Sequence, residues 1–196
     1  MTYRTDNVSR FRAFGSRGLV VFERDGILLR TKRLSEDLVL KDLNHALIGL
    51  LRRFRSRGIR FGFLCNDRGM DGGSAGWVAT LALMDLIDAI LRVNDAEPDF
   101  WIAMPFSKRT RNPNARKARD DARSSFMLLR AIEWYGIEKS QVVLVGNSRA
   151  CRMVAGADGM TALEYSASTS QADESRSADL LEIERIENVV KTALGL

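Results

Sequence analysis

Apolar and polar positions alternate in blocks along this chain, and the blocks predict strands and helices in turn. Short apolar runs bounded by polar residues or glycine predict buried strands at 18–22, 59–64, 100–103, 142–145 and 160–165. Apolar residues at helical spacing predict helices from Leu40 to a stop at Gly58, and at 75–93, 126–135 and 149–157. A final amphipathic helix is predicted from the apolar positions Leu180, Ile183, Ile186, Val189, Val190 and Leu194.

This alternation of strands and helices predicts the fold class. It is typical of βαβ units, and therefore of an α/β three-layer sandwich around a mostly parallel, Rossmann-like sheet. The polar residues 1–16 are expected to form a loose N-terminal arm, and residues 17–196 a single domain. Within that domain, a Ser-rich linker at 166–178 is expected to lead to the terminal helix.

Composition narrows the function classes. Hydrophobic residues make up 45% of the chain and charged residues 28%, as in soluble globular proteins. The longest apolar stretch, 77–91, contains Asp85 and Asp88 and is too short and too charged to span a bilayer. No signal peptide is recognisable, and two cysteines without a CxxC pattern favour free thiols. We therefore expect a cytoplasmic protein with no membrane partner.

Basic residues give a net charge of +5 and gather in two clusters. The first comprises Arg52, Arg53, Arg55, Arg57 and Arg60, and the second Lys108, Arg109, Arg111, Arg116, Lys117 and Arg119. The first is predicted to be a solvated helix face and the second a solvated loop. The alternative is an anionic ligand or partner, for which the loop is the better candidate of the two. Nucleic acid is a less favoured partner, because no aromatic residues for base stacking are interleaved with these charges.

Polar side chains follow three of the predicted strands. Glu23 and Asp25 come after the first strand, Cys65 and Asn66 after the second, and Asn147 after the fourth. The carboxyl ends of parallel strands meet at one edge of a sheet, where ligands of such folds bind. We therefore expect these residues to form one site.

Three segments around these residues resemble motifs of the haloacid dehalogenase-like superfamily. They are 21–26, 63–70 and 145–159, and the closest resemblance is to the histidinol-phosphate and heptose-bisphosphate phosphatases. The resemblance covers roughly residues 18–165 and implies a fold with little or no cap. It also implies site roles: Glu23 and Asp25 at the nucleophile and general-acid positions, Cys65, Asn66, Asp67 and Lys117 as phosphate ligands, and Glu23, Asp25 and Asn147 as magnesium ligands.

The chain departs from this pattern at the chemically important positions. Glu23 carries one methylene more than the family's aspartate, and in-line attack tolerates little displacement. Asn147 and Cys151 replace acidic residues, which weakens a site for a hard dication. Cys65 replaces a hydroxyl, and a thiol is a weak hydrogen-bond donor. The segment 104–106 lacks the ligands of the family's zinc loop, so no zinc is expected.

These departures predict a catalytically degenerate phosphatase-like protein that binds a phosphorylated ligand or a protein partner. One alternative is a weak, atypical magnesium-dependent phosphomonoesterase that uses Glu23 or another carboxylate, such as Asp67 or Asp71. Another is a basic module associated with nucleic acid. Two residues also have structural interpretations: Asp25 as a hydrogen-bond partner of its loop, and Cys65 as a small buried apolar residue.

Overall fold

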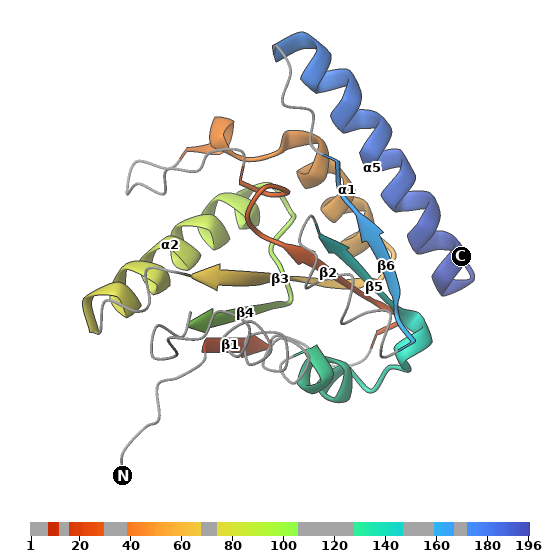
Figure 1. Cartoon of the computed structure of the whole chain (residues 1–196), viewed down its shortest axis with the longest axis horizontal. Helices are drawn as coiled ribbons and strands as arrows, with labels where there is room; N and C mark the ends of the chain where they lie inside the picture. The colour runs from red at the N-terminus through yellow and green to blue at the C-terminus, as the bar shows by residue number, and fades with distance from the viewer. Residues whose placement is uncertain are drawn as a thin grey trace, which may run out of the picture.

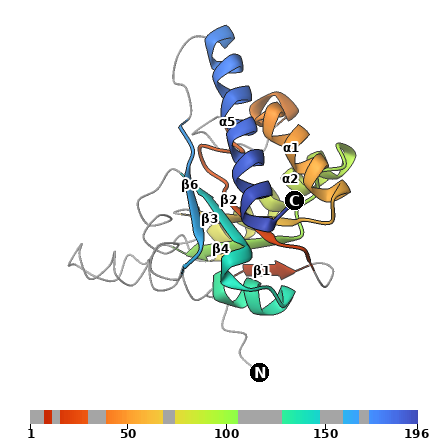
Figure 2. The same ribbon diagram turned by 90° about the vertical axis from the view of Figure 1, so that its right-hand side faces the viewer.

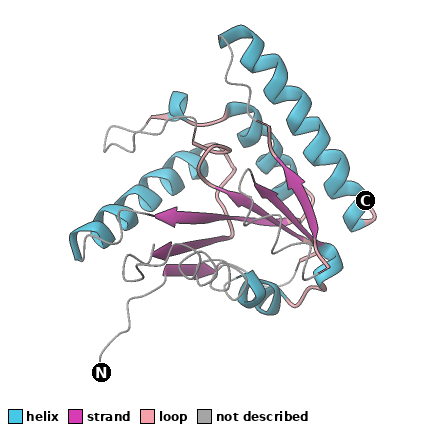
Figure 3. Cartoon of the chain, viewed as in Figure 1, coloured by secondary structure: helices cyan, strands magenta, loops and turns pink. Residues whose placement is uncertain are grey.

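A twisted six-stranded sheet forms the centre of the molecule (Figures 1 and 3). The computed structural model describes residues 8–11, 16–29, 39–67, 74–105, 128–146, 159–166 and 172–196. The strands are β1 (Val8–Phe11), β2 (Leu19–Glu23), β3 (Arg60–Asp67), β4 (Phe100–Pro105), β5 (Val142–Gly146) and β6 (Thr161–Glu164). Their order is β1-β4-β3-β2-β5-β6; β2 to β6 are parallel and β1 is antiparallel to β4.

Helices cover both faces of the sheet (Figure 2). The described helices are η1 (Leu40–Asp42), α1 (His45–Ser56), α2 (Ser74–Val93), a helix at 128–135, η3 (Lys139–Gln141) and α5 (Ala172–Leu194). One core lies under α1, α2 and α5 and contains alternate strand residues such as Phe22, Phe63 and Val145. The other lies under the helix at 128–135 and contains the intervening residues, such as Val21 and Leu144. This arrangement confirms the predicted α/β sandwich.

Three boundaries differ from the sequence prediction. Val8–Phe11, assigned to a loose arm, forms β1 and pairs with β4 from Val8↔Ala103 to Phe11↔Phe100. The terminal helix begins at Ala172, inside the expected Ser-rich linker. The helix expected from Leu40 is divided, because Leu43 bridges to Leu29 and the Asn44 side chain caps α1 by accepting from the Leu47 amide.

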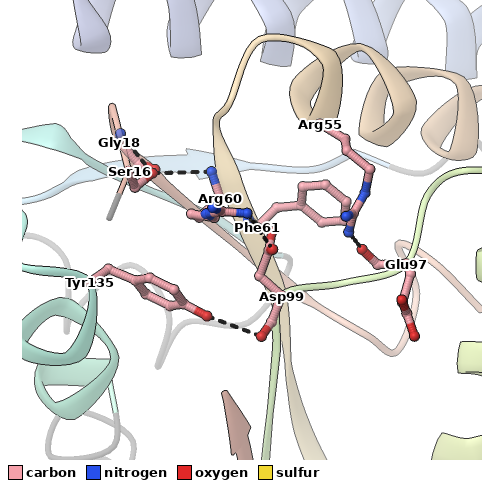
Figure 4. A network of polar contacts seen from close by, with 8 residues as sticks. All are labelled: Ser16, Gly18, Arg55, Arg60, Phe61, Glu97, Asp99 and Tyr135. Carbon is pink, nitrogen blue, oxygen red and sulfur yellow. Dashed lines mark hydrogen bonds and ion pairs between the residues drawn. The ribbon is translucent and has the colours of Figure 1, made fainter. Parts of the chain in front are cut away.

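A polar network fixes the amino edge of the sheet (Figure 4). Buried Asp99 accepts hydrogen bonds from the Arg60 guanidinium at 3.0 Å and the Phe61 amide at 3.2 Å. The Tyr135 hydroxyl donates to the Asp99 carbonyl at 3.0 Å. Burial raises the pKa of Asp99, although the Phe61 amide and the neighbouring arginines act to lower it. This network lies at the end of the sheet opposite the predicted site.

The first basic cluster attaches neighbouring segments to α1. Arg53 and Arg57 both form ion pairs with Glu187 of α5, each at 2.8 Å. Arg52 donates to the Asn94 carbonyl, and Arg55 donates to the Glu97 carbonyl and stacks over Phe61. Arg52, Arg53, Arg55 and Arg57 are exposed, as expected for a helix face, whereas Arg60 is partly buried at the start of β3. The guanidinium groups of the cluster bind neighbouring segments of the fold. None of the helices in the described ranges is long and apolar enough to span a membrane.

Candidate functional site

The carboxyl ends of β2, β3 and β5 lie side by side, as the sequence analysis predicted. Glu23 is the last residue of β2 and is paired in register with Leu64 of β3. On the other side of β2, Phe22 is paired with Val145, one residue before the end of β5 at Gly146. Asn147 follows Gly146 directly in the chain but lies outside the described residues. The segments 21–26 and 63–70 therefore meet at this edge, and the described part of the segment 145–159 leads to it.

A tight turn follows Glu23. The Arg24 amide donates to the Leu64 carbonyl at 3.0 Å, and the Arg24 carbonyl accepts from the amides of Leu28 and Leu29. Gly26 has φ 84°, a left-handed conformation that glycine adopts without steric cost. Ile27, Leu28 and Leu29 are buried in the core, so the turn is anchored immediately behind the site.

Arg24 is the feature that sequence reasoning missed. Its side chain is only 1% exposed, although it carries a permanent charge. The guanidinium donates to both carboxylate oxygens of Asp25, from Nε to Oδ1 at 2.8 Å and from Nη2 to Oδ2 at 3.1 Å. The Asp25 side chain is 50% exposed. The sequence signal was an arginine between Glu23 and Asp25, two residues after the end of an apolar run.

Cys65 is part of the apolar core rather than of the exposed surface at this edge. It is fully buried in the core beneath α1, α2 and α5, on the same face of β3 as Phe61 and Phe63. Side chains alternate across a strand, so Glu23 lies on the opposite face of β2 from Phe22, which belongs to that core. This placement supports the interpretation of Cys65 as a small buried apolar residue.

The end of β3 projects beyond the end of β2. The last β2–β3 pair is Glu23↔Leu64, whereas the pairing of β3 with β4 continues to Asp67↔Pro105. The main chain at Asn66 and Asp67 therefore has a strand on one side, while β2 has already ended on the other. The side chains of these two residues, together with Lys117 and Cys151, lie outside the described part of the structure.

A buried network of polar side chains lies next to this edge, since one of its members, Tyr165, donates its amide to the Gly146 carbonyl. The sequence analysis did not predict this network. The Asn44 Nδ2 donates to the Tyr165 hydroxyl at 2.9 Å, and that hydroxyl donates to Asp179 Oδ1 at 2.9 Å. All three side chains are at most 5% exposed. The only sequence signal was Asn44 itself, a preferred N-cap residue type just before a helical pattern.

The described donors alone do not make a magnesium site. Glu23 and Asp25 offer carboxylates, but both Asp25 oxygens face the Arg24 guanidinium. Within the described ranges, no group of three histidine, cysteine, aspartate or glutamate residues could hold a metal ion. The third ligand implied by the resemblance, Asn147, lies outside these ranges and offers a neutral amide in place of a carboxylate.

Solved structures with the same fold were found by comparison of coordinates. A candidate HAD-like phosphatase from Mesorhizobium loti matches with a TM-score of 0.62 and 17% identity, over 94% of this chain and 96% of that one. The D,D-heptose 1,7-bisphosphate phosphatase of B. bronchiseptica, complexed with magnesium and phosphate, matches with a TM-score of 0.56 and 12% identity, over 87% and 99%. No protein-family model matches the sequence, and no curated protein matches it. At these identities the likeness concerns the fold.

Proposed function

We propose that this protein, which has the fold of the haloacid dehalogenase-like phosphatases, binds a phosphorylated small molecule at the carboxyl edge of its sheet and hydrolyses little or none of it. The observation that carries this proposal is the ion pair between buried Arg24 and Asp25. In this pair the carboxylate of Asp25, at the general-acid position, stabilises the buried guanidinium of Arg24.

Because Arg24 is buried, it needs the counter-charge that Asp25 provides. A buried charge is costly unless it is paired and hydrogen-bonded, and Arg24 is only 1% exposed. Asp25 supplies a counter-charge with two-point geometry, which is the strong form of an arginine–carboxylate pair. A general acid must turn a protonated oxygen toward the leaving group. To do so here, Asp25 would have to give up at least one of its bonds to Arg24.

Glu23 supports the same conclusion from the nucleophile position. The strand register fixes its backbone opposite Leu64, so the additional methylene displaces the carboxylate relative to that of an aspartate. A misplacement of about 1 Å at a reacting centre can cost about a hundredfold in rate. Glu23 and Asn147 could still contact magnesium together with the Asp25 carbonyl, as a weakened site.

The projecting end of β3 supports anion binding at the same edge. Main-chain amides at the edge of a sheet can bind an anion, and the last two residues of β3, Asn66 and Asp67, continue past the end of β2. The second basic cluster, which includes Lys117, would add positive charge there. A nucleic-acid role through the first cluster has less support, because Arg53 and Arg57 are paired with Glu187.

The proposal is tested by measuring turnover and binding separately. With magnesium present, hydrolysis of an aryl phosphate by the wild type should equal that of Glu23→Gln purified in parallel. Calorimetric titration with inorganic phosphate in EDTA should still show binding. Lys117→Glu should weaken that binding, whereas Lys139→Glu, exposed on η3 at the opposite edge, should not.

Two results would contradict the proposal. Robust wild-type hydrolysis that Asp25→Asn abolishes would identify an atypical phosphomonoesterase. Absence of phosphate binding at millimolar concentrations, with or without magnesium, would remove the ligand class and leave a protein partner as the alternative.

A further inference from the structure

The buried residues Asn44, Tyr165 and Asp179 connect the C-terminal helix with both described parts of the candidate site. Asp179 belongs to α5, Tyr165 follows β6, and Asn44 precedes α1. Asn44 and Tyr165 differ by 121 in residue number, and Tyr165 and Asp179 by 14. One hydroxyl group, that of Tyr165, joins the other two side chains.

Two members of this network, Asn44 and Tyr165, contact the main chain beside the site. The Asn44 amide donates to the Leu28 carbonyl at 2.9 Å, and the Leu28 amide donates to the Arg24 carbonyl at 3.0 Å. The Tyr165 amide donates to the carbonyl of Gly146, the residue before Asn147, at 3.0 Å. Tyr165 is thus two hydrogen bonds from Leu28, in the turn that follows Glu23, and one from Gly146 at the end of β5.

We propose that Tyr165 and Asp179 are positioning residues, through which α5 sets the relative placement of the Arg24–Asp25 turn and the end of β5. This inference rests on the proposed function only in taking that edge as the binding site. The turn after Glu23 and the end of β5 belong to different strands, and the network links both of them to one buried side chain, that of Tyr165. Buried polar groups in such a network favour a unique arrangement, since any displacement leaves a donor or acceptor unsatisfied.

The structure provides a matched control on the opposite edge. Tyr135 and Tyr165 are both 3% exposed, and each donates a hydrogen bond from its hydroxyl to an aspartate, to a carbonyl in one case and a carboxylate in the other. Figure 4 shows Tyr135 directed at Asp99 within the amino-edge network. Tyr135→Phe and Tyr165→Phe therefore remove the same atom from equally buried sites at opposite ends of the sheet.

The test records the Arg24 Nε–H and backbone amide resonances by NMR in the full chain without ligand. Tyr165→Phe should shift the signals of Arg24, Leu28 and Gly146, and Tyr135→Phe should leave them in place. Asp179→Asn keeps an acceptor oxygen for Tyr165 and should resemble the wild type, whereas Asp179→Ala should resemble Tyr165→Phe. This second pair keeps the test decisive if Tyr165→Phe does not fold.

Binding of inorganic phosphate gives the functional readout. We expect Tyr165→Phe to weaken binding about tenfold or more and Tyr135→Phe less than about twofold, where tenfold corresponds to about 1.4 kcal/mol. Unmoved Arg24 and Gly146 signals in Tyr165→Phe, or equal shifts in Tyr135→Phe, would overturn the inference. If the signals shift as expected but the wild type binds no phosphate, the proposed function fails while the positioning role stands.

Discussion

Glu187 offers the sharpest test of how α5 is held against the rest of the fold. Its carboxylate accepts hydrogen bonds from Arg53 and Arg57 of α1 and pairs with Lys191 one turn further along α5. Burial acts to raise the pKa of Glu187, but the hydrogen bonds from Arg57, Arg53 and Lys191 prevail and lower it from 4.5 to about 2. The perturbation we consider is Glu187→Gln, which keeps the shape of the side chain and removes its charge.

The magnitude follows from linkage between protonation and folding. Taken at face value, a fall in pKa from 4.5 to about 2 would correspond to about 3 kcal/mol of stability at neutral pH. The Arg53 and Arg57 side chains are 44% and 40% exposed, so solvent screening reduces this figure. We therefore expect Glu187→Gln to lower the free energy of unfolding by about 1–2 kcal/mol at pH 7.

The pH dependence has a definite sign. A carboxylate whose pKa is depressed by folding contributes stability above its unfolded pKa, and this is lost as the pH falls toward the folded value. The difference between wild type and Glu187→Gln should be constant above about pH 5.5 and should decline between about pH 4.5 and 2, with more than half of it lost by about pH 3.

Urea unfolding followed by circular dichroism between pH 3 and 7 measures this difference. Glu184→Gln is the matched control, because Glu184 is an exposed carboxylate on the same helix. Equal stability of wild type and Glu187→Gln at pH 7 would refute the reasoning. So would a difference that stays the same down to pH 3.

Three further substitutions test the site and the core. Asp25→Asn should lower the free energy of unfolding by about 1–3 kcal/mol, because buried Arg24 loses a counter-charge that is itself half exposed; unchanged stability would contradict the structural role of Asp25. Cys65→Ser should destabilise by about 1–3 kcal/mol by placing a hydroxyl in the apolar core, and titration should show no gain in phosphate affinity; a gain would mean that position 65 faces the ligand. Gly62→Ala should destabilise by about 1–3 kcal/mol through overpacking, since its Cβ would lie 2.4 Å from the Phe100 carbonyl oxygen; urea unfolding with an unchanged midpoint would show that β4 can move aside.

The sequence by itself determined the elements whose signal is local. The strands at 19–23 and 142–146 and the helix at 74–93 were predictable, because each has the apolar pattern of its own neighbours along the chain. The edge that carries the candidate site also followed from sequence, since βαβ units fix strand direction and thereby bring the strand ends together. The replacement of motif acidic residues by Glu23, Asn147 and Cys151 was also visible in the sequence alone.

Only the tertiary structure decided the features that depend on distant partners. Val8–Phe11 becomes a strand because the edge of β4 is available to pair with it, which its polar surroundings in sequence did not indicate. The face on which Cys65 lies depends on the register of β3 within the sheet. Arg24 can be buried because the Asp25 carboxylate pairs with its guanidinium and the turn after it is packed into the core. Asn44, Tyr165 and Asp179 meet because three separate elements converge behind the site, and periodicity within one segment carries no information about such contacts.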